Sequence, residues 1–194
     1  MRPLCLILAC PRSGTSYTNK VLRGHGLDFT HEQTHGADGA IGWQYVAEGR
    51  YSDKAGHRSD RLWDVVLHQV RNPLDVIGSM QSHSAQLWDF IASEIDGFPR
   101  VDQPIKRRMM FWLEWNRRAE SMASFTYRVE DVGCGKATDK TLGDILGVEM
   151  RETGQSRTTN KRPHATMTMD DLRRASKGMA KEIEQMATWY GYKL

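Results

Sequence analysis

Short apolar runs alternate along this chain with longer stretches in which apolar residues recur at helical spacing. Three runs predict buried strands, at residues 4–10, 65–70 and 125–129, and a weaker one lies at residues 27–30. Continuous apolar strands separated by helices are typical of parallel sheets, whose two faces are both covered. The pattern therefore predicts an α/β fold with a central parallel sheet flanked by helices.

Sequence signals for helix ends indicate that the stretches between these strands are helices. The first helix is expected at residues 15–23, before Gly24 or Gly26, and a long one at residues 103–123. Asn72–Pro73 supplies an N-cap and a proline at the first helical position. A capping box at residues 168–171 opens a last helix that we expect to reach about Tyr190.

Three segments interrupt this alternation. Residues 32–62 are rich in glycine, and a connection this long is usually functional, so we expect Glu32 to Leu62 to be an acceptor-side segment or lid. Residues 148–167 are polar and basic and predict a loop. The basic runs at residues 106–108 and 117–118 predict a solvated helix face.

Length and composition are those of a soluble globular protein with one domain spanning residues 1–194. The net charge of +3 suits a nucleotide cosubstrate and is too small for nucleic-acid binding. No apolar run is long enough to span a bilayer. Cys5, Cys10 and Cys134 are odd in number and lack metal or redox spacing, which predicts reduced thiols and a cytoplasmic location.

The first ten residues allow two interpretations. A basic start followed by an apolar run resembles a signal peptide. That run is at the lower length limit, and the turn at residues 11–14 interrupts it at once. A buried strand is therefore the favoured interpretation.

A turn with the chemistry of an anion site follows this strand. A strand that leads through a glycine-containing turn into a helix presents backbone N–H groups to a phosphate. The usual nucleotide loop places lysine after its last glycine, but here Thr15 follows Gly14 and the cation, Arg12, precedes it. A guanidinium there can bind phosphate or sulfate through two hydrogen bonds. The turn predicts an anion site unlike that of kinases and ATPases.

A second arginine follows another predicted strand. Arg71 comes directly after residues 65–70, and Ser79 lies two turns along the next helix, on the same side as Asn72. The two could hold a second phosphate, although a surface ion pair and an incidental serine fit the sequence equally well. Because ligands bind at the carboxyl ends of parallel strands, Arg12 and Arg71 are expected to line one crevice. The strand lacks the terminal aspartate that holds Mg²⁺ in ATPases.

Together these stretches resemble the sulfotransferase family. Residues 11–16 match its 5′-phosphosulfate loop, P-[KR]-S-G-T-[TS], and residues 71–79 match its 3′-phosphate motif, R-[ND]-P with a later serine. The resemblance implies a three-layer P-loop-like fold and the cosubstrate 3′-phosphoadenosine 5′-phosphosulfate (PAPS). It places Arg71 and Ser79 at the 3′-phosphate and Tyr17 near the adenine. The residues implied for the 5′-phosphosulfate are Arg12, Ser13, Gly14, Thr15 and Ser16.

The chain departs from that family further along. In residues 128–131, Val129 replaces the tyrosine that would approach the nucleotide. The late basic loop of the family has a single candidate, residues 159–162. The resemblance therefore leaves the remaining nucleotide contacts open.

Sulfuryl transfer needs a base for the acceptor hydroxyl and positive charge on the leaving phosphate. The resemblance favours Glu32 as the base, with Arg12 stabilising the transferred group; His31, His35 and His68 stay open as alternatives. Adenosine 3′,5′-bisphosphate leaves, and no metal ion is required. The acceptor hydroxyl belongs to a carbohydrate, a lipid, a small metabolite or a protein tyrosine.

Two other functions remain compatible with the sequence. One is an ATP- or GTP-dependent phosphotransferase with a degenerate phosphate loop, against which the absent lysine and aspartate argue. The other is a non-catalytic nucleotide-binding protein that has kept the fold. Nucleotide preference and sulfate transfer distinguish the three.

Overall fold

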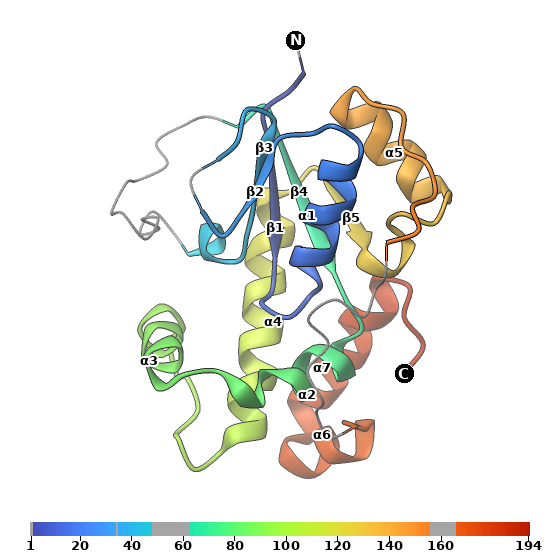
Figure 1. The fold of residues 1–194 in the computed structure, drawn as a ribbon. Coiled ribbons are helices and arrows are strands. Elements are labelled where there is room, and N and C mark those ends of the chain that lie inside the picture. The colour runs from blue at the N-terminus through green and yellow to red at the C-terminus, as the bar shows by residue number, and fades with distance from the viewer. Residues whose placement is uncertain (1, 34, 48–62, 156–165) are drawn as a thin grey trace.

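The computed structural model describes residues 2–33, 35–47, 63–155 and 166–194 (Figure 1). At its centre five strands form one sheet in the order β2-β3-β1-β4-β5, with every neighbouring pair parallel. The strands are β1 (Cys5–Ala9), β2 (Phe29–His31), β3 (Gly39–Gly42), β4 (Val65–Val70) and β5 (Phe125–Arg128). The predicted α/β fold with a parallel sheet is confirmed.

Strand β3 is the one described strand that the apolar pattern did not predict. It lies next to β1 inside the region that we expected to be an acceptor-side segment or lid, so residues 39–42 of that region belong to the central sheet, and its acceptor-side role stays a prediction. Glycine is required here because a Cβ on Gly39 would lie 2.0 Å from the Cys5 carbonyl oxygen. Residues 48–62 of that segment lie outside the described residues, as does the candidate basic loop at residues 159–162.

Helices cover both faces of the sheet (Figure 1). Cys5 and Ile7 of β1 point to the face covered by α1 and α5, whereas Leu6 and Leu8 point to the face covered by α4. This alternation agrees with a three-layer arrangement. The helices are α1 (Thr15–Gly24), α2 (Pro73–Ser79), α3 (Ala85–Glu94), α4 (Pro104–Met122), α5 (Ala137–Leu146), α6 (Met169–Ala175) and α7 (Lys177–Trp189), with short 3₁₀ turns η1 (Gln44–Val46), η2 (Met80–Ser82) and η3 (Val129–Asp131).

The last predicted helix is two helices. The capping box at Thr168 is present and starts α6, as expected. The expected continuous helix is interrupted at Ser176, whose backbone is extended (φ −163°, ψ 110°) and whose hydroxyl accepts a hydrogen bond from the Met179 N–H at 3.4 Å. Ser176 therefore ends α6 and caps α7.

The basic residues of α4 do not form a purely solvated face, so that prediction is wrong for several of them. Arg108 is only 8 % exposed and donates to the Ile77 carbonyl in the last turn of α2. Arg118 donates to the Glu94 carbonyl at the end of α3. Both guanidinium groups satisfy carbonyls at helix C-termini, where positive charge is stabilising.

None of the described helices is long and apolar enough to cross a membrane.

Candidate anion-binding site

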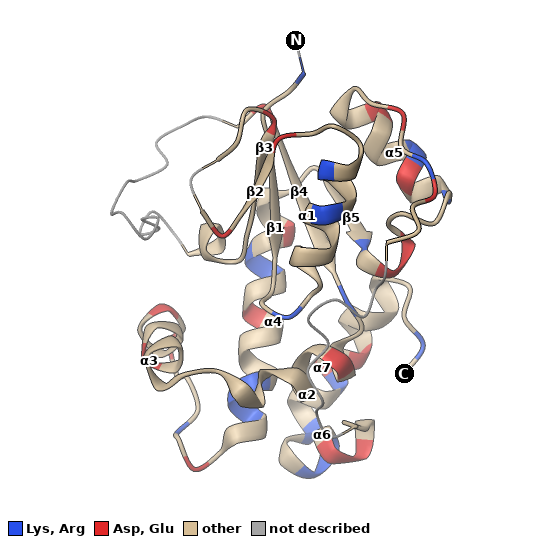
Figure 2. Ribbon diagram, in the orientation of Figure 1, with Lys and Arg blue, Asp and Glu red and all other residues tan. Residues whose placement is uncertain are grey.

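Three sequence-predicted elements meet at the carboxyl edge of the sheet. From β1 the chain passes first to β2 and β3 on one side and later to β4 on the other, so the strand order switches at β1. The loop after β1, the arginine after β4 and the end of β2 all lie at this edge. Figure 2 shows basic positions on the ribbon just past the carboxyl ends of β1 and β4.

The β1–α1 loop (residues 10–14) makes a tight turn. The Ser13 N–H donates to the Cys10 carbonyl at 3.2 Å, and Arg12 and Gly14 have left-handed backbones with φ of 72° and 82°. A Cβ on Gly14 would lie 3.0 Å from Val129 Cγ2, so both the backbone angle and the space favour glycine. Gly14 is the N-cap of α1 and sets the direction in which that helix starts.

Two side chains from the end of β4 hold the carbonyls of this loop. Gln69 Nε2 donates to the Ser13 carbonyl at 2.7 Å, and Arg71 Nη1 donates to the Arg12 carbonyl at 3.1 Å. Gln69 is fully buried and accepts in turn from the Tyr127 hydroxyl at 3.1 Å. Sequence analysis missed Gln69 and Tyr127, although an amide inside an apolar strand signals a buried hydrogen bond.

Fixing the carbonyls leaves the loop's donors available. Among the described residues, none accepts from the backbone N–H groups of Gly14, Thr15 and Ser16. The Ser13 hydroxyl is also buried with no hydrogen-bond partner in the described part of the chain. These donors at the start of α1, next to Arg12, form a site that a phosphate or sulfate group can fill.

His31, at the end of β2, lies against the same helix start. Its Nε2 lies 2.8 Å from Thr15 Oγ1, 3.3 Å from Ser16 Oγ and 3.9 Å from Glu32 Oε1. Burial lowers the pKa of His31, and the Glu32 carboxylate offsets this only in part. The imidazole is therefore mostly uncharged near neutral pH.

Glu32 is fixed at the backbone and open at the side chain. Its N–H donates to the Ile41 carbonyl at 2.8 Å, and its backbone is left-handed with φ of 53°. The side chain is 36 % exposed. The structure thus brings Glu32 and His31 to the β1–α1 loop, with His31 between the carboxylate and the hydroxyls of Thr15 and Ser16.

The other two candidate bases have different surroundings. His68 is fully buried, with Nε2 3.0 Å from Asn116 Oδ1 and Nδ1 3.3 Å from Thr126 Oγ1. Burial lowers the pKa of His68 to about 4. His35 lies 3.1 Å from the Gly36 carbonyl through Nδ1 and packs edge-on against Trp63. The surroundings of His68 are those of a core residue, which no acceptor hydroxyl can reach.

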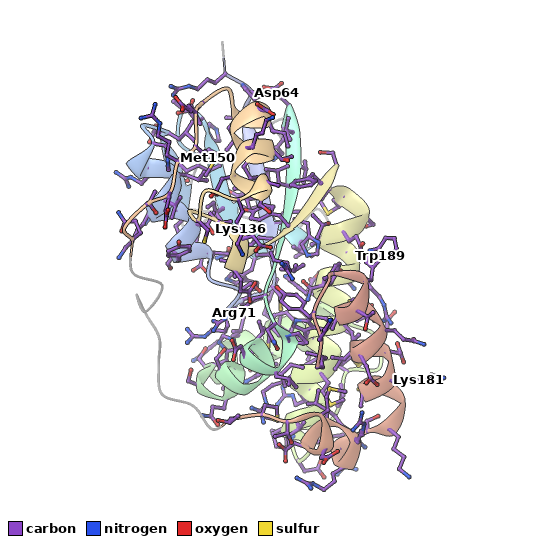
Figure 3. All side chains as sticks on the ribbon, turned by 90° about the vertical axis from the view of Figure 1, so that its right-hand side faces the viewer. Asp64, Arg71, Lys136, Met150, Lys181 and Trp189 are labelled. Atoms are coloured by element: carbon purple, nitrogen blue, oxygen red, sulfur yellow. The ribbon has the colours of Figure 1, made fainter. Side chains whose placement is uncertain are left out.

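Arg71 reaches the loop, whereas Ser79 is engaged within its own helix. Arg71 Nη2 donates to Asp75 Oδ2 at 3.0 Å, so Arg71 joins α2 to the β1–α1 loop. Figure 3 shows Arg71 at the junction between the sheet and the helices below it. Ser79 is 5 % exposed and donates to the Val76 carbonyl at 3.0 Å. Both the surface ion pair and the link between the two predicted motifs are therefore present at Arg71.

Tyr17 belongs to the core between α1 and α5. It is buried, and its hydroxyl donates to the Val132 carbonyl at 3.0 Å. This contact ties α1 to the turn that precedes α5, which is a structural role.

The described residues hold no group of three or more His, Cys, Asp or Glu side chains placed to bind a metal ion.

The site can bind a tetrahedral anion through amides and guanidinium groups, with a carboxylate and an imidazole beside it. No family model and no curated protein matches this chain, so its chemistry is argued from this geometry.

Proposed function

We propose that the protein is a sulfotransferase that moves the sulfuryl group of PAPS to an acceptor hydroxyl, on a P-loop-like fold. One observation supports this above the others. Arg71, at the end of β4, donates to the carbonyl of Arg12 in the β1–α1 loop, so two arginines meet beside amide donors from which no described residue accepts. A donor nucleotide with phosphate groups at both its 5′ and 3′ positions matches two such cationic arms.

In the proposed complex the 5′-phosphosulfate occupies the β1–α1 loop. The N–H groups of residues 14–16 and the Arg12 guanidinium bind its oxygens through charge-assisted hydrogen bonds. Arg71 binds the 3′-phosphate with the guanidinium that now faces Asp75. Ser79 contributes only if its hydroxyl turns away from the Val76 carbonyl.

The transfer is an in-line displacement at sulfur. Glu32 accepts the proton of the acceptor hydroxyl, the hydroxyl oxygen forms a bond to sulfur, and the bond from sulfur to the bridging phosphate oxygen breaks. Adenosine 3′,5′-bisphosphate leaves with the electron pair of that bond. Arg12 and the loop amides stabilise the charge that develops there, and the proposal needs no metal ion. His31 orients the Thr15 and Ser16 hydroxyls.

The acceptor is proposed only as a class: a carbohydrate, lipid, small-metabolite or protein-tyrosine hydroxyl. The partly exposed carboxylate of Glu32 marks the point where that hydroxyl would enter. The cytoplasmic location also stays a prediction, and it accords with three cysteines that form no disulfide.

A thermal-shift titration tests the donor. Without Mg²⁺, adenosine 3′,5′-bisphosphate at 100 times its Kd should stabilise the folded protein by about 2.7 kcal/mol. Mg²⁺-ATP should stabilise it far less. A preference for Mg²⁺-ATP would instead support the phosphotransferase with a degenerate phosphate loop, in which Thr15 stands where the usual loop has lysine.

Incubation with labelled PAPS and a panel of acceptors, followed by mass spectrometry, tests the transfer. Sulfated product is expected, together with adenosine 3′,5′-bisphosphate in equal amount. Tight bisphosphate binding with no sulfated product from any acceptor would leave a non-catalytic nucleotide-binding protein.

A further inference from the structure

We propose that Glu130 and Tyr192 are positioning residues. They set the distance between the two proposed anion-binding groups, the β1–α1 loop with Arg12 and the Arg71 side chain, and thereby the preference for a nucleotide with a 3′-phosphate. The inference rests on the proposed function, because it takes Arg71 as the 3′-phosphate ligand. Neither residue has a local sequence signal for this role. Both are assigned it by contacts made at the carboxyl edge of the sheet.

Glu130 holds the start of α2. Its Oε1 accepts from the backbone N–H of Asn72 at 3.2 Å. Asn72 is the N-cap of α2 and directly follows Arg71, and its own side chain accepts from the Leu74 N–H at 3.0 Å. A hydrogen bond to a carboxylate is stronger than one between neutral groups. Glu130 therefore fixes the backbone from which the Arg71 side chain extends.

Tyr192 holds Glu130 from the other side. The Tyr192 hydroxyl donates to Glu130 Oε2 at 2.7 Å, and the residue is only 8 % exposed. Burial and the neighbouring carboxylate raise the pKa of Tyr192, which keeps its hydroxyl protonated as a donor. The Tyr192 N–H donates to the Ala187 carbonyl, and Arg128 donates to the Gly191 carbonyl at 2.9 Å. These bonds anchor Tyr192 to α7 and to the end of β5.

The segment of residues 129 and 130 also contacts the β1–α1 loop. Val129, the residue before Glu130, lies against Gly14 so closely that a Cβ on Gly14 would come within 3.0 Å of it. Residues 129 and 130 thus contact the β1–α1 loop on one side and the start of α2 on the other. Moving Glu130 would change the position of Arg71 relative to Arg12 without removing either arginine.

The experiment compares two nucleotides that differ in one phosphate. Calorimetry gives the Kd of adenosine 3′,5′-bisphosphate and of adenosine 5′-monophosphate for the full chain and for Glu130→Ala, Glu130→Gln and Tyr192→Phe. Glu130→Ala should weaken bisphosphate binding about tenfold, the value of one charge-assisted hydrogen bond, and 5′-monophosphate binding less than twofold. Glu130→Gln retains an acceptor for the Asn72 N–H and should recover most of the loss. Tyr192→Phe should lose about threefold, again for the bisphosphate alone.

Tyr190→Phe is the matched control. Tyr190 lies two residues away in the same segment, is similarly buried, and donates to another carboxylate, Glu120 Oε2, at 2.9 Å. Because that bond has no contact with Asn72 or the β1–α1 loop, the preference for the bisphosphate should not change. Tyr192→Phe removes a single oxygen, so it also tests the proposal if Glu130→Ala fails to fold.

The outcomes separate this inference from the proposed function. A wild-type chain that binds both nucleotides equally would overturn the proposed 3′-phosphate role of Arg71, and the positioning role with it. A wild-type chain that prefers the bisphosphate, combined with variants that keep this preference or lose both nucleotides equally, would overturn the positioning role alone.

Discussion

Two turns of backbone amides stand before helices in this molecule, and they differ in what fills them. Before α5, the N–H groups of Gly133, Cys134 and Gly135 all donate to the Asp139 carboxylate at 2.7 Å. Asp139 is 1 % exposed, so this turn is closed to any ligand. Before α1, the corresponding N–H groups of residues 14–16 have no acceptor within the described ranges. Both turns have left-handed glycines.

The difference lies in the first turn of each helix. Helix α5 supplies its own anion, because Asp139 occupies the third helical position. Helix α1 has no acidic residue in its first turn and has Thr15 and Ser16 there instead. The turn before α5 is completed by a carboxylate of the chain itself, whereas the proposed function has the N–H groups at the start of α1 bind an anion from solution. The two turns thus contrast a contact that stabilises the fold with a proposed ligand site.

The largest effect should follow a change beside the turn at residues 14–16, called the open turn below because no described residue accepts from its N–H groups. Glu32→Gln should lower turnover by about 100- to 10,000-fold, the usual contribution of a general base. Bisphosphate affinity should change little, because in the proposed mechanism Glu32 contacts the acceptor and not the donor. Turnover with labelled PAPS and a thermal-shift titration measure the two quantities. Glu149→Gln, an exposed carboxylate paired with Arg151, is the control, and unchanged turnover in Glu32→Gln would remove Glu32 from the mechanism.

The next effect should appear at the filled turn and in stability. Asp139→Ala removes the acceptor of three N–H groups, of which that of Gly133 is buried and the other two are partly buried, and should cost about 3 kcal/mol of unfolding free energy. Urea unfolding measures this loss, and Asp139→Asn, which keeps one oxygen acceptor, should lose less. Asp144→Ala, an exposed change in the same helix, should stay within about 0.5 kcal/mol of wild type. Equal losses at positions 139 and 144 would contradict the assignment of a filled anion turn.

The smallest effect is the pH dependence of the open turn. Because burial lowers the pKa of His31, the unfolded chain binds a proton more readily than the folded one. The contribution of His31 to stability is therefore complete above pH 6.5, the ordinary value, and is lost as the pH falls below it. A bound anion has the opposite effect, since it favours the protonated imidazole.

Nucleotide binding at the open turn should accordingly take up a proton at His31. Between pH 7.5 and 5.5 the bisphosphate affinity of wild type, divided by that of His31→Gln, should rise by roughly threefold. The ratio removes the titration of the ligand's own phosphates. A ratio independent of pH would mean that His31 does not respond to the anion.

Local signals explain which elements could be predicted. The apolar run at residues 65–70 is β4 with the same bounds, and Asn72–Pro73 starts α2 where expected. Strand β3 has no such signal, since Gly39 and Gly42 leave it too little apolar surface to register as a strand. The break at Ser176 was also missed, because a serine can equally continue a helix.

The site divides in the same way. Arg12, Arg71 and Glu32 lie within two residues of the ends of predicted strands, so parallel topology alone brings them to one edge. The residues that hold them could not be predicted, because their contacts join distant parts of the chain. Gln69 reaches Ser13 across 56 positions, and Tyr192 reaches Glu130 across 62. Hydrophobic periodicity contains no information about such pairs.

Arg12 and Glu32 are the described non-glycine residues with left-handed backbones, and both are assigned chemistry. Each such residue costs about 1 kcal/mol relative to a glycine at the same position. Selection for heat resistance alone would therefore enrich Arg12→Gly and Glu32→Gly. A library sorted only by melting temperature would thus discard the two side chains on which the proposed reaction depends, and a stabilisation campaign on this protein should keep both codons fixed.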